Sequence, residues 1–292
     1  METFSVKRIL IPVDFSETAL LALDHATFMA KLFKADIILI HVVEKFSFKI
    51  DIRKKGDEAS DDRMIRERLS ELAEGVKHQT GGSVTILMKA GKIAKKIVEA
   101  ANETQADIII LGTHGVSGFE EFFMGSNAFR VVTEAQCPVM SVQVHSTKVG
   151  FNDIVLPIDN SAASRQKVRY AVELAKHYNS RIHIAGILTL DYRDIRKKFM
   201  AKLKQVEDYI TKHGISHTTE IMKGENIANL TLKHAESLNA DLIVIMTEQE
   251  DELTGLLMGT FAQQVVNHSK IPVMTVKPSL KPDIEMNVFS GV

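Results

Sequence analysis

The chain carries one pattern twice, and this internal repeat limits its fold more than any other feature of the sequence. Four apolar segments of the first half return in the second half: RILIPVDFSETA as NDIVLPIDNSAAS, ADIILIHVV as SRIHIAGIL, QADIIILGT as NADLIVIMT, and QCPVMSV as KIPVMTV. From Met88 to Gly125 the two copies align without a gap, at an offset of 134 residues. The sequence therefore predicts two copies of one domain, joined near residues 145 to 151.

Within each copy, short apolar runs alternate with segments of helical periodicity. In the first copy they predict strands at 7–16, 35–43, 83–89, 106–111 and 137–144, and helices at 17–33, 62–79, 92–104 and 126–135. Residues 45–62 are charged and irregular, and we expect a loop there. The apolar runs do not alternate with polar residues, which is typical of parallel strands covered on both faces. The sequence thus predicts an α/β fold of two tandem, doubly wound, Rossmann-like domains, each with a five-stranded parallel sheet.

A glycine-rich loop follows the fourth strand of the first copy. In ADIIILGTHGVSGFEEFFMGS, residues 106–126, glycines stand at 112, 115, 118 and 125. Glycine lets the backbone approach a ligand, and the first turn of a helix offers unpaired N–H groups and the positive end of its dipole. Such a stretch can hold phosphate. An ordinary strand-to-helix loop is an equal alternative on the glycines alone, because neither GxGxxG nor the P-loop GxxxxGK[ST] is present.

Two side chains stand where a parallel sheet binds its ligands, at the carboxyl ends of strands. Asp14 closes the first strand, and Ser126 follows the glycine-rich loop. We predict Ser126 as the N-cap of the next helix, where its hydroxyl could cap the helix or donate to a phosphate oxygen. These two uses compete for one side chain.

The glycine spacing and the repeat together resemble a known family. The pattern Gly112-x2-Gly115-x9-Gly125-Ser126 is similar, in spacing and identity, to the G-x2-G-x9-G-[S/T] motif of the ATP-binding universal stress proteins. The resemblance extends over nearly the whole chain and is to the tandem members of that family. It implies an adenine-nucleotide α-hydrolase-like fold for each domain and an internal pseudo-dimer joined through the last strands. We place domain 1 at 1–146, domain 2 at 150–278 and a C-terminal tail at 279–292.

The resemblance also implies an ATP site in the first copy, with Mg2+ sharing the phosphate charge. Asp14 would lie near the adenine and ribose, the backbone of Val42 would meet the base, and Ser126 would bind a phosphate. The implied site comprises Pro12, Val13, Asp14, Val42, Gly112, Thr113, His114, Gly115, Val116, Gly125, Ser126 and Asn127. For His114, a half-exposed loop histidine without a ligand role is the favoured alternative.

The second copy departs from this motif. Met246-Thr247-Glu248-Gln249 replaces Gly112-Thr113-His114-Gly115, and only Gly259-Thr260 and Asp159 remain. Carboxylates at 248, 250, 251 and 252 put negative charge where a polyphosphate would lie. We predict that copy 2 does not bind ATP in this manner and serves pairing or regulation, with a purely structural half as the alternative. Neither this acidic run nor the one at 57–62 has EF-hand spacing, so both are read as solvated loops.

Composition removes several other classes of function. The 292 residues carry 36 Lys and Arg against 37 Asp and Glu, with 6% aromatics and no Trp, so nothing argues for nucleic acid or a membrane surface. One cysteine excludes an intrachain disulfide and a cysteine-based zinc cluster. The N-terminus lacks a signal-peptide pattern and no apolar run reaches the ~18 residues of a membrane span. We therefore expect a soluble, cytoplasmic protein.

Catalytic groups are sparse around the motif. The loop 112–126 contains no Lys or Arg, and no GxSxG elbow is present. A phosphoryl-transfer enzyme needs positioned metal ligands and usually an added cation. We predict no enzyme, or at most a slow ATPase. The preferred function is an ATP-binding stress-response protein that signals to an unidentified protein partner or stabilises an oligomer, including a homodimer of pseudo-dimers. A slow metal-dependent ATPase and a nucleotide-free interaction scaffold remain as alternatives.

Overall fold

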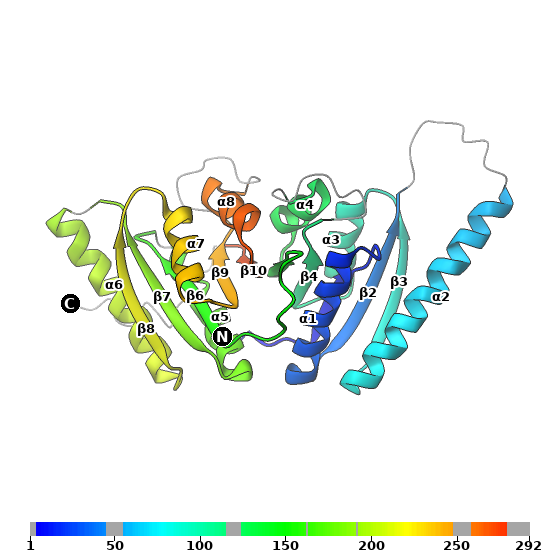
Figure 1. The fold of residues 1–292 in the computed structure, drawn as a ribbon, viewed down its shortest axis with the longest axis horizontal. Coiled ribbons are helices and arrows are strands. Elements are labelled where there is room, and N and C mark those ends of the chain that lie inside the picture. Colours follow the sequence, from blue (N-terminus) through cyan, green and yellow to red (C-terminus); the bar gives the residue numbers. More distant parts are fainter. Residues whose placement is uncertain are drawn as a thin grey trace.

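The computed structural model describes residues 4–44, 55–114, 124–161, 163–190, 192–247 and 258–278, with side chains from residue 62 onward in the second range. It consists of two α/β halves that meet at the centre of the molecule (Figure 1). No helix in these ranges is both long and apolar enough to cross a membrane.

Each half contains five strands and four α-helices, in the order expected from the repeat. Domain 1 contains β1 (Arg8–Pro12), α1 (Glu17–Phe33), β2 (Asp36–Val43), α2 (Lys55–Thr80), β3 (Val84–Ala90), α3 (Ile93–Glu103), β4 (Ile108–Gly112), α4 (Ser126–Glu134) and β5 (Val139–Val142). Domain 2 contains β6 (Asp153–Ile158), the 3-10 turn η1 (Ala163–Arg165), α5 (Val168–Tyr178), β7 (Arg181–Leu188), α6 (Arg193–Lys212), β8 (His217–Lys223), α7 (Ile227–Ser237), β9 (Leu242–Met246), α8 (Thr260–His268) and β10 (Val273–Val276).

The ten strands form one continuous sheet in the order β3-β2-β1-β4-β5-β10-β9-β6-β7-β8. All neighbours within a domain are parallel, whereas β5 and β10 pair antiparallel, with Met140 opposite Met274. This confirms the predicted doubly wound halves and their pseudo-dimer through the last strands. The order reverses at β1 and β4 in domain 1, the switch point where doubly wound sheets bind ligands.

Helices cover both faces of the sheet, and the strand residues alternate between the two cores. Ile9 and Ile11 of β1 belong to the core under α1, α2, α5 and α6, whereas Leu10 belongs to the core under α3, α4, α7 and α8. All three side chains are fully buried. Burial on both faces explains why the strands read as continuous apolar runs, as the two-residue period of a strand sends neighbours to opposite sides.

Aromatic side chains form a second contact between the domains, on the face that carries α1 and α5. The ring of Phe33 stacks on His177 at a centroid distance of 3.9 Å, and Phe151 of the connecting segment packs against Tyr178 at 4.8 Å. His25 stacks on Phe151 and hydrogen-bonds through Nε2 to the carbonyl of Ser146 at 3.0 Å. The connecting segment is therefore held against α1.

The helix α2 begins earlier than the sequence predicts. We expected a loop through residue 62, but the backbone is helical from Lys55, so the acidic run at 57–62 lies in this helix. Among its described side chains, from residue 62 onward, the first fully buried one is Leu69. Figure 1 shows the start of α2 projecting away from the sheet. Residues 55–61 contain no large apolar residue, so hydrophobic periodicity could not reveal this first part of the helix.

A close contact between α1 and β4 depends on a residue without a side chain. A Cβ atom on Gly112 would lie 2.6 Å from the backbone carbon of Thr18, nearer than any packed carbon allows. In domain 2 the counterpart is Met246, and there α5 begins only at Val168, the counterpart of Leu23, after the 3-10 turn η1. Gly112 thus allows the first turns of α1 to pack on β4.

We expect Gly112→Ala to lower the free energy of unfolding by about 1–3 kcal/mol, the usual cost of overpacking, because the added methyl group meets backbone. Gly75→Ala is the matched control. Its Cβ meets nothing within 4 Å in the middle of α2, so it should stabilise the protein by about 0.5–1 kcal/mol. Urea unfolding measures both, and equal effects of the two variants would contradict this account of Gly112.

Candidate functional site

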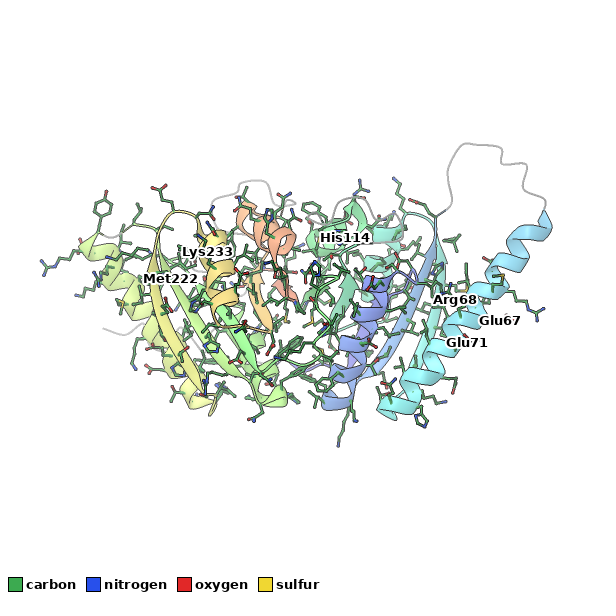
Figure 2. All side chains as sticks on the ribbon, in the orientation of Figure 1. Glu67, Arg68, Glu71, His114, Met222 and Lys233 are labelled. Carbon is green, nitrogen blue, oxygen red and sulfur yellow. The ribbon has the colours of Figure 1, made fainter. Side chains whose placement is uncertain are left out.

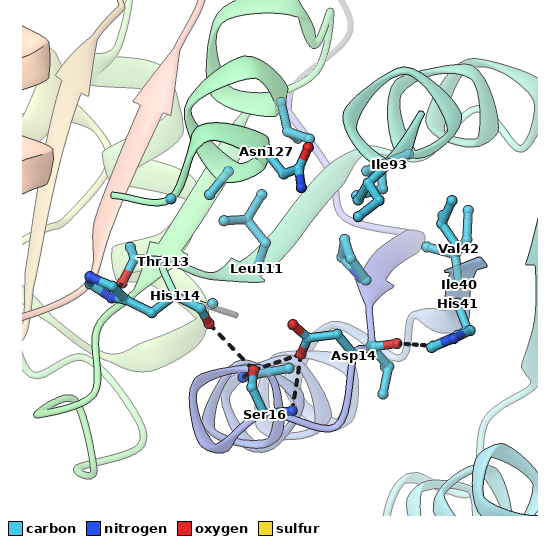
Figure 3. Close-up of a pocket in the computed structure, with 18 of the residues that line it drawn as sticks. Asp14, Ser16, Ile40, His41, Val42, Ile93, Leu111, Thr113, His114 and Asn127 are labelled. Atoms are coloured by element: carbon cyan, nitrogen blue, oxygen red, sulfur yellow. Dashed lines mark hydrogen bonds between the residues drawn. The ribbon is translucent and has the colours of Figure 1, made fainter. Parts of the chain in front are cut away.

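A cleft lies at the carboxyl ends of β1, β2 and β4, between the N-terminal turns of α1 and α4 (Figure 3). Its volume is about 190 Å³. The corresponding space in domain 2 is about 10 Å³. Among the described residues, only those of the first domain therefore leave room for a ligand at the switch point of the sheet.

A tight turn after β1 presents a carboxylate to the cleft. Asp14 Oδ1 accepts hydrogen bonds from the Ser16 backbone N–H at 3.0 Å and from the Ser16 hydroxyl at 2.6 Å. Ser16 also caps α1, because its Oγ accepts from the N–H of Ala19 at 3.2 Å. The start of α1 thus holds one oxygen of Asp14, and Figure 3 shows the other directed toward the cavity.

Phe15, between these two residues, has a left-handed backbone with φ 64°, which is uncommon for an aromatic residue. Its ring lies under the guanidinium of Arg68, with 4.1 Å from Cζ to the centroid, and beside His41 at 5.5 Å. Figure 2 labels Arg68 on the part of α2 that lies over β3. The Nδ1 of His41 hydrogen-bonds the carbonyl of Val13 at 2.7 Å. These contacts fix the strained turn that carries Asp14.

The end of β4 is tied to both neighbouring helices. Thr113 receives the N–H of Gly125 on its carbonyl at 2.8 Å and donates its own N–H to Val142 at 3.0 Å. The carbonyl of His114 accepts from the hydroxyls of Thr18 and Ser16. The imidazole Nδ1 of His114 lies 2.9 Å from the Thr113 hydroxyl, and Figure 3 places this ring beside Thr113 rather than Asp14.

The N-cap of α4 lies one residue earlier than we predicted. Gly125 is the N-cap and Ser126 is the first helical residue, so Ser126 does not cap the helix. At the first helical position, a serine side chain cannot accept the hydrogen bonds that the second and third helical N–H groups donate to an N-cap side chain. The exposed Ser126 hydroxyl and the N–H groups of Ser126, Asn127 and Ala128 all stand at the cleft, where the helix dipole is positive.

Apolar side chains line the opposite wall. Ile93 and Ile97, one turn apart on α3, and Ile40 and Val42 of β2 form this wall. An apolar wall beside a polar, N–H-rich wall suits a molecule with a flat ring at one end and an anionic group at the other. Ile40, Ile93 and Ile97 are not among the predicted site residues, although their positions at the carboxyl end of β2 and the start of α3 could have indicated them.

The structure brings ten of the twelve predicted site residues together around this cleft: Pro12, Val13, Asp14, Val42, Gly112, Thr113, His114, Gly125, Ser126 and Asn127. The other two, Gly115 and Val116, lie outside the described residues. Further lining residues that the sequence did not single out are Ser16, Ala19, His41, Leu111, Ala128 and Val131.

Few ionic groups of the described chain serve this cleft. No group of three or more His, Cys, Asp or Glu side chains in the described ranges could hold a metal ion. Lys89 pairs with Glu103 at 2.8 Å, and Lys96 with Glu99 at 2.6 Å. Burial raises the pKa of the Cys137 thiol to about 11, consistent with a structural rather than a reactive cysteine.

Domain 2 fills the equivalent space with its own side chains. Met246 and Phe261 stand where domain 1 has Gly112 and Asn127, and both line the residual pocket. Lys167, the counterpart of Ala22, is 2% exposed, and its Nζ donates to the carbonyl and the hydroxyl of Ser164 at 2.7 and 3.1 Å. The acidic segment 248–252 lies outside the described residues, so its predicted repulsion of phosphate stays a prediction.

The chain matches the model of one protein family twice. The model described as the universal stress protein family matches residues 5–143 and 150–277. Two universal stress proteins of Methanocaldococcus jannaschii are similar to half of the chain: one is 35% identical over 140 residues, covering 47% of this chain and 82% of its own length. The other is 30% identical over 155 residues, covering 47% of this chain and 94% of its own length.

A solved structure shares the tandem architecture. The crystal structure of a universal stress protein from Archaeoglobus fulgidus DSM 4304 superimposes with a TM-score of 0.77 at 23% identity, over 95% of this chain and 98% of that chain. Similarity at this level of identity shows that the fold is shared.

Because the turn at Phe15 is strained, we expect a glycine variant at this position to be more stable than an alanine variant. Phe15→Ala and Phe15→Gly both remove the ring from Arg68 and His41, but only glycine adopts a positive φ without steric cost. We therefore expect Phe15→Gly to be the more stable by about 1 kcal/mol in urea unfolding. A less stable glycine variant would show that the left-handed turn is not under strain.

The buried Lys167 predicts a pH-dependent contribution in domain 2. Burial lowers the pKa of Lys167 from 10.5 to about 8, partly offset by Asp159. Between these two values the unfolded chain keeps the proton that the folded chain has lost, so stability increases with pH. We expect the unfolding free energy of wild type, relative to Lys167→Met, to rise from about pH 8 to about pH 10.5. A difference that stays flat over this window would contradict the buried, desolvated amine.

Proposed function

The chain belongs to the universal stress protein family, and from that premise we propose that its first domain binds ATP in the cleft between β1, β4 and α4. The main support for this proposal is that residues far apart in the sequence meet in one cavity. Ten residues predicted from three separate stretches of sequence, at 12–14, 42 and 112–127, line one cavity. The cavity has an apolar end, a carboxylate in the middle and a polar, N–H-rich end, which is the order of base, ribose and phosphates in a nucleotide.

The apolar end of the cleft suits the base. Ile93, Ile97, Ile40 and Val42 together offer an apolar surface for a planar ring. Asp14 stands between this surface and α4, with one carboxylate oxygen held by Ser16. A ribose hydroxyl could donate to the other oxygen, as carboxylates do for the ribose of other nucleotides.

The polar end suits phosphate groups. The first turn of α4 offers three N–H groups and the Ser126 hydroxyl, and the helix dipole favours an anion there. A Cβ at Gly125 would lie 3.3 Å from the Thr113 carbonyl oxygen. Glycine at this position therefore lets the start of α4 lie close to the end of β4. Mg2+ would be held chiefly by the phosphates themselves and would neutralise charge that no described lysine or arginine of the cleft can.

Binding, rather than rapid turnover, is the chemistry that these groups support. The described lining contains neither a cation for the transferred phosphate nor a carboxylate set for a catalytic metal. We therefore propose a nucleotide-responsive binding protein, whose occupied state is read by a protein partner or stabilises an oligomer. Any hydrolysis would be slow.

Charge at the N-cap of α4 tests the proposal. Asp is a favourable N-cap, so Gly125→Asp should preserve the helix while placing a carboxylate against the phosphates. We expect the affinity for ATP with Mg2+ to fall at least about tenfold by calorimetric titration. Gly125→Asn has nearly the same shape without charge and should lose much less affinity.

Gly259→Asp is the matched control in domain 2, because Gly259 caps α8 with nearly the same backbone angles as Gly125 caps α4. This variant should bind ATP as tightly as wild type. Wild-type protein that shows no heat with ATP, and retains no nucleotide through purification by mass spectrometry, would reject the proposal. Steady release of phosphate over many turnovers would favour the enzyme alternative.

A further inference from the structure

The interface between the domains is built from reciprocal contacts. The hydroxyl of Ser141 on β5 donates to the carbonyl of Val273, and its counterpart Thr275 on β10 donates to the carbonyl of Val139. The first contact measures 3.2 Å and the second 3.0 Å. Each half thus makes the same contact toward the other, as a two-fold pseudo-symmetry requires.

One hydrogen bond across this interface breaks the symmetry. The side-chain carbonyl of Asn267, near the end of α8, accepts the backbone N–H of Met124 at 3.2 Å. The residue of domain 1 that corresponds to Asn267 is Thr133, and its hydroxyl donates to the Phe129 carbonyl of its own helix at 2.9 Å. A threonine in this state does not extend to Met258, the counterpart of Met124.

The asymmetric contact lies directly beside the proposed phosphate site. Met124 immediately precedes Gly125 and Ser126, and its side chain is buried in the core under α3, α4, α7 and α8. The next N–H, that of Gly125, is held by the Thr113 carbonyl at 2.8 Å. Two successive N–H groups are therefore fixed, one by β4 of domain 1 and one by α8 of domain 2. The same Gly-to-Thr bond recurs in domain 2, from Gly259 to Thr247.

We propose that Asn267 is a positioning residue for the nucleotide site of domain 1. By accepting the Met124 N–H, it sets the direction of the chain that enters α4, and so aims the N–H groups of the first turn and the Ser126 hydroxyl at the phosphates. This inference rests on the proposed function and adds a role for domain 2. The domain whose described residues leave the smaller space at its own switch point supports the cleft of its neighbour.

A phosphate-specific loss of affinity distinguishes this role from a merely structural one. In Asn267→Ala and Asn267→Thr, calorimetry should show ATP binding about three- to tenfold weaker than in wild type, the effect expected of one neutral hydrogen bond. Adenosine, which lacks phosphates, should bind within about twofold of wild type. Hydrogen exchange of the Met124 amide, followed by mass spectrometry without any ligand, should become faster in both variants.

Two control variants separate Asn267 from its surroundings. Gln263→Ala removes an exposed side chain from the same helix, and Thr133→Asn places the amide on the corresponding position of domain 1. Both should leave ATP affinity within about twofold of wild type. Unchanged ATP affinity in Asn267→Ala, or equal losses for ATP and adenosine, would overturn the positioning role while leaving ATP binding intact. A wild-type protein that binds neither ligand would overturn the proposed function and this inference together.

Discussion

The antiparallel pairing of β5 with β10 is the contact on which the rest of the structure depends. An unpaired β5 would expose a row of backbone donors and acceptors at the edge of a parallel sheet. Pairing satisfies them, buries Met140 against Met274 and extends five strands into ten. It also places α4 and α8 on the same side of the sheet near the pseudo-two-fold axis, so that a residue of one domain reaches the site of the other (Figure 1).

The two domains diverge at a few positions with large consequences. Glycine at 112 lets α1 begin against β4, and this helix start supplies Ser16 and the turn of Asp14. Methionine at 246 accompanies a helix that begins later, and Phe261 and Lys167 occupy what space remains. The cores of both domains tolerate these differences because the differing residues lie at the ends of strands, where they line the cleft rather than the core. Shared architecture therefore does not require a shared ligand.

Much of this organisation can be predicted from the sequence, because periodicity and repeats record local structure. The helix at 17–33 has the predicted bounds, and the pairing through the last strands agrees with expectation. Ten of the predicted site residues line one cleft. Other features arise only from folding. Arg68 and Phe15 meet through the packing of α2 against α1 and β3, and Asn267 reaches Met124 across the interface. No local pattern encodes such contacts. The early start of α2 could not be predicted either, because residues 55–61 contain no large apolar residue.

Phe151 and the hydrogen bond from His25 to Ser146 hold the segment that joins the domains against α1. Because this segment makes the two domains one chain, they can diverge in sequence. In a homodimer every substitution appears twice, and a change that benefits one subunit is imposed on the other. Here each position exists once per molecule, so selection can act on one half alone. The joined pair also assembles at any protein concentration, because its halves never separate by dilution. An asymmetric bond such as that from Met124 to Asn267 can be kept only in a protein of this kind.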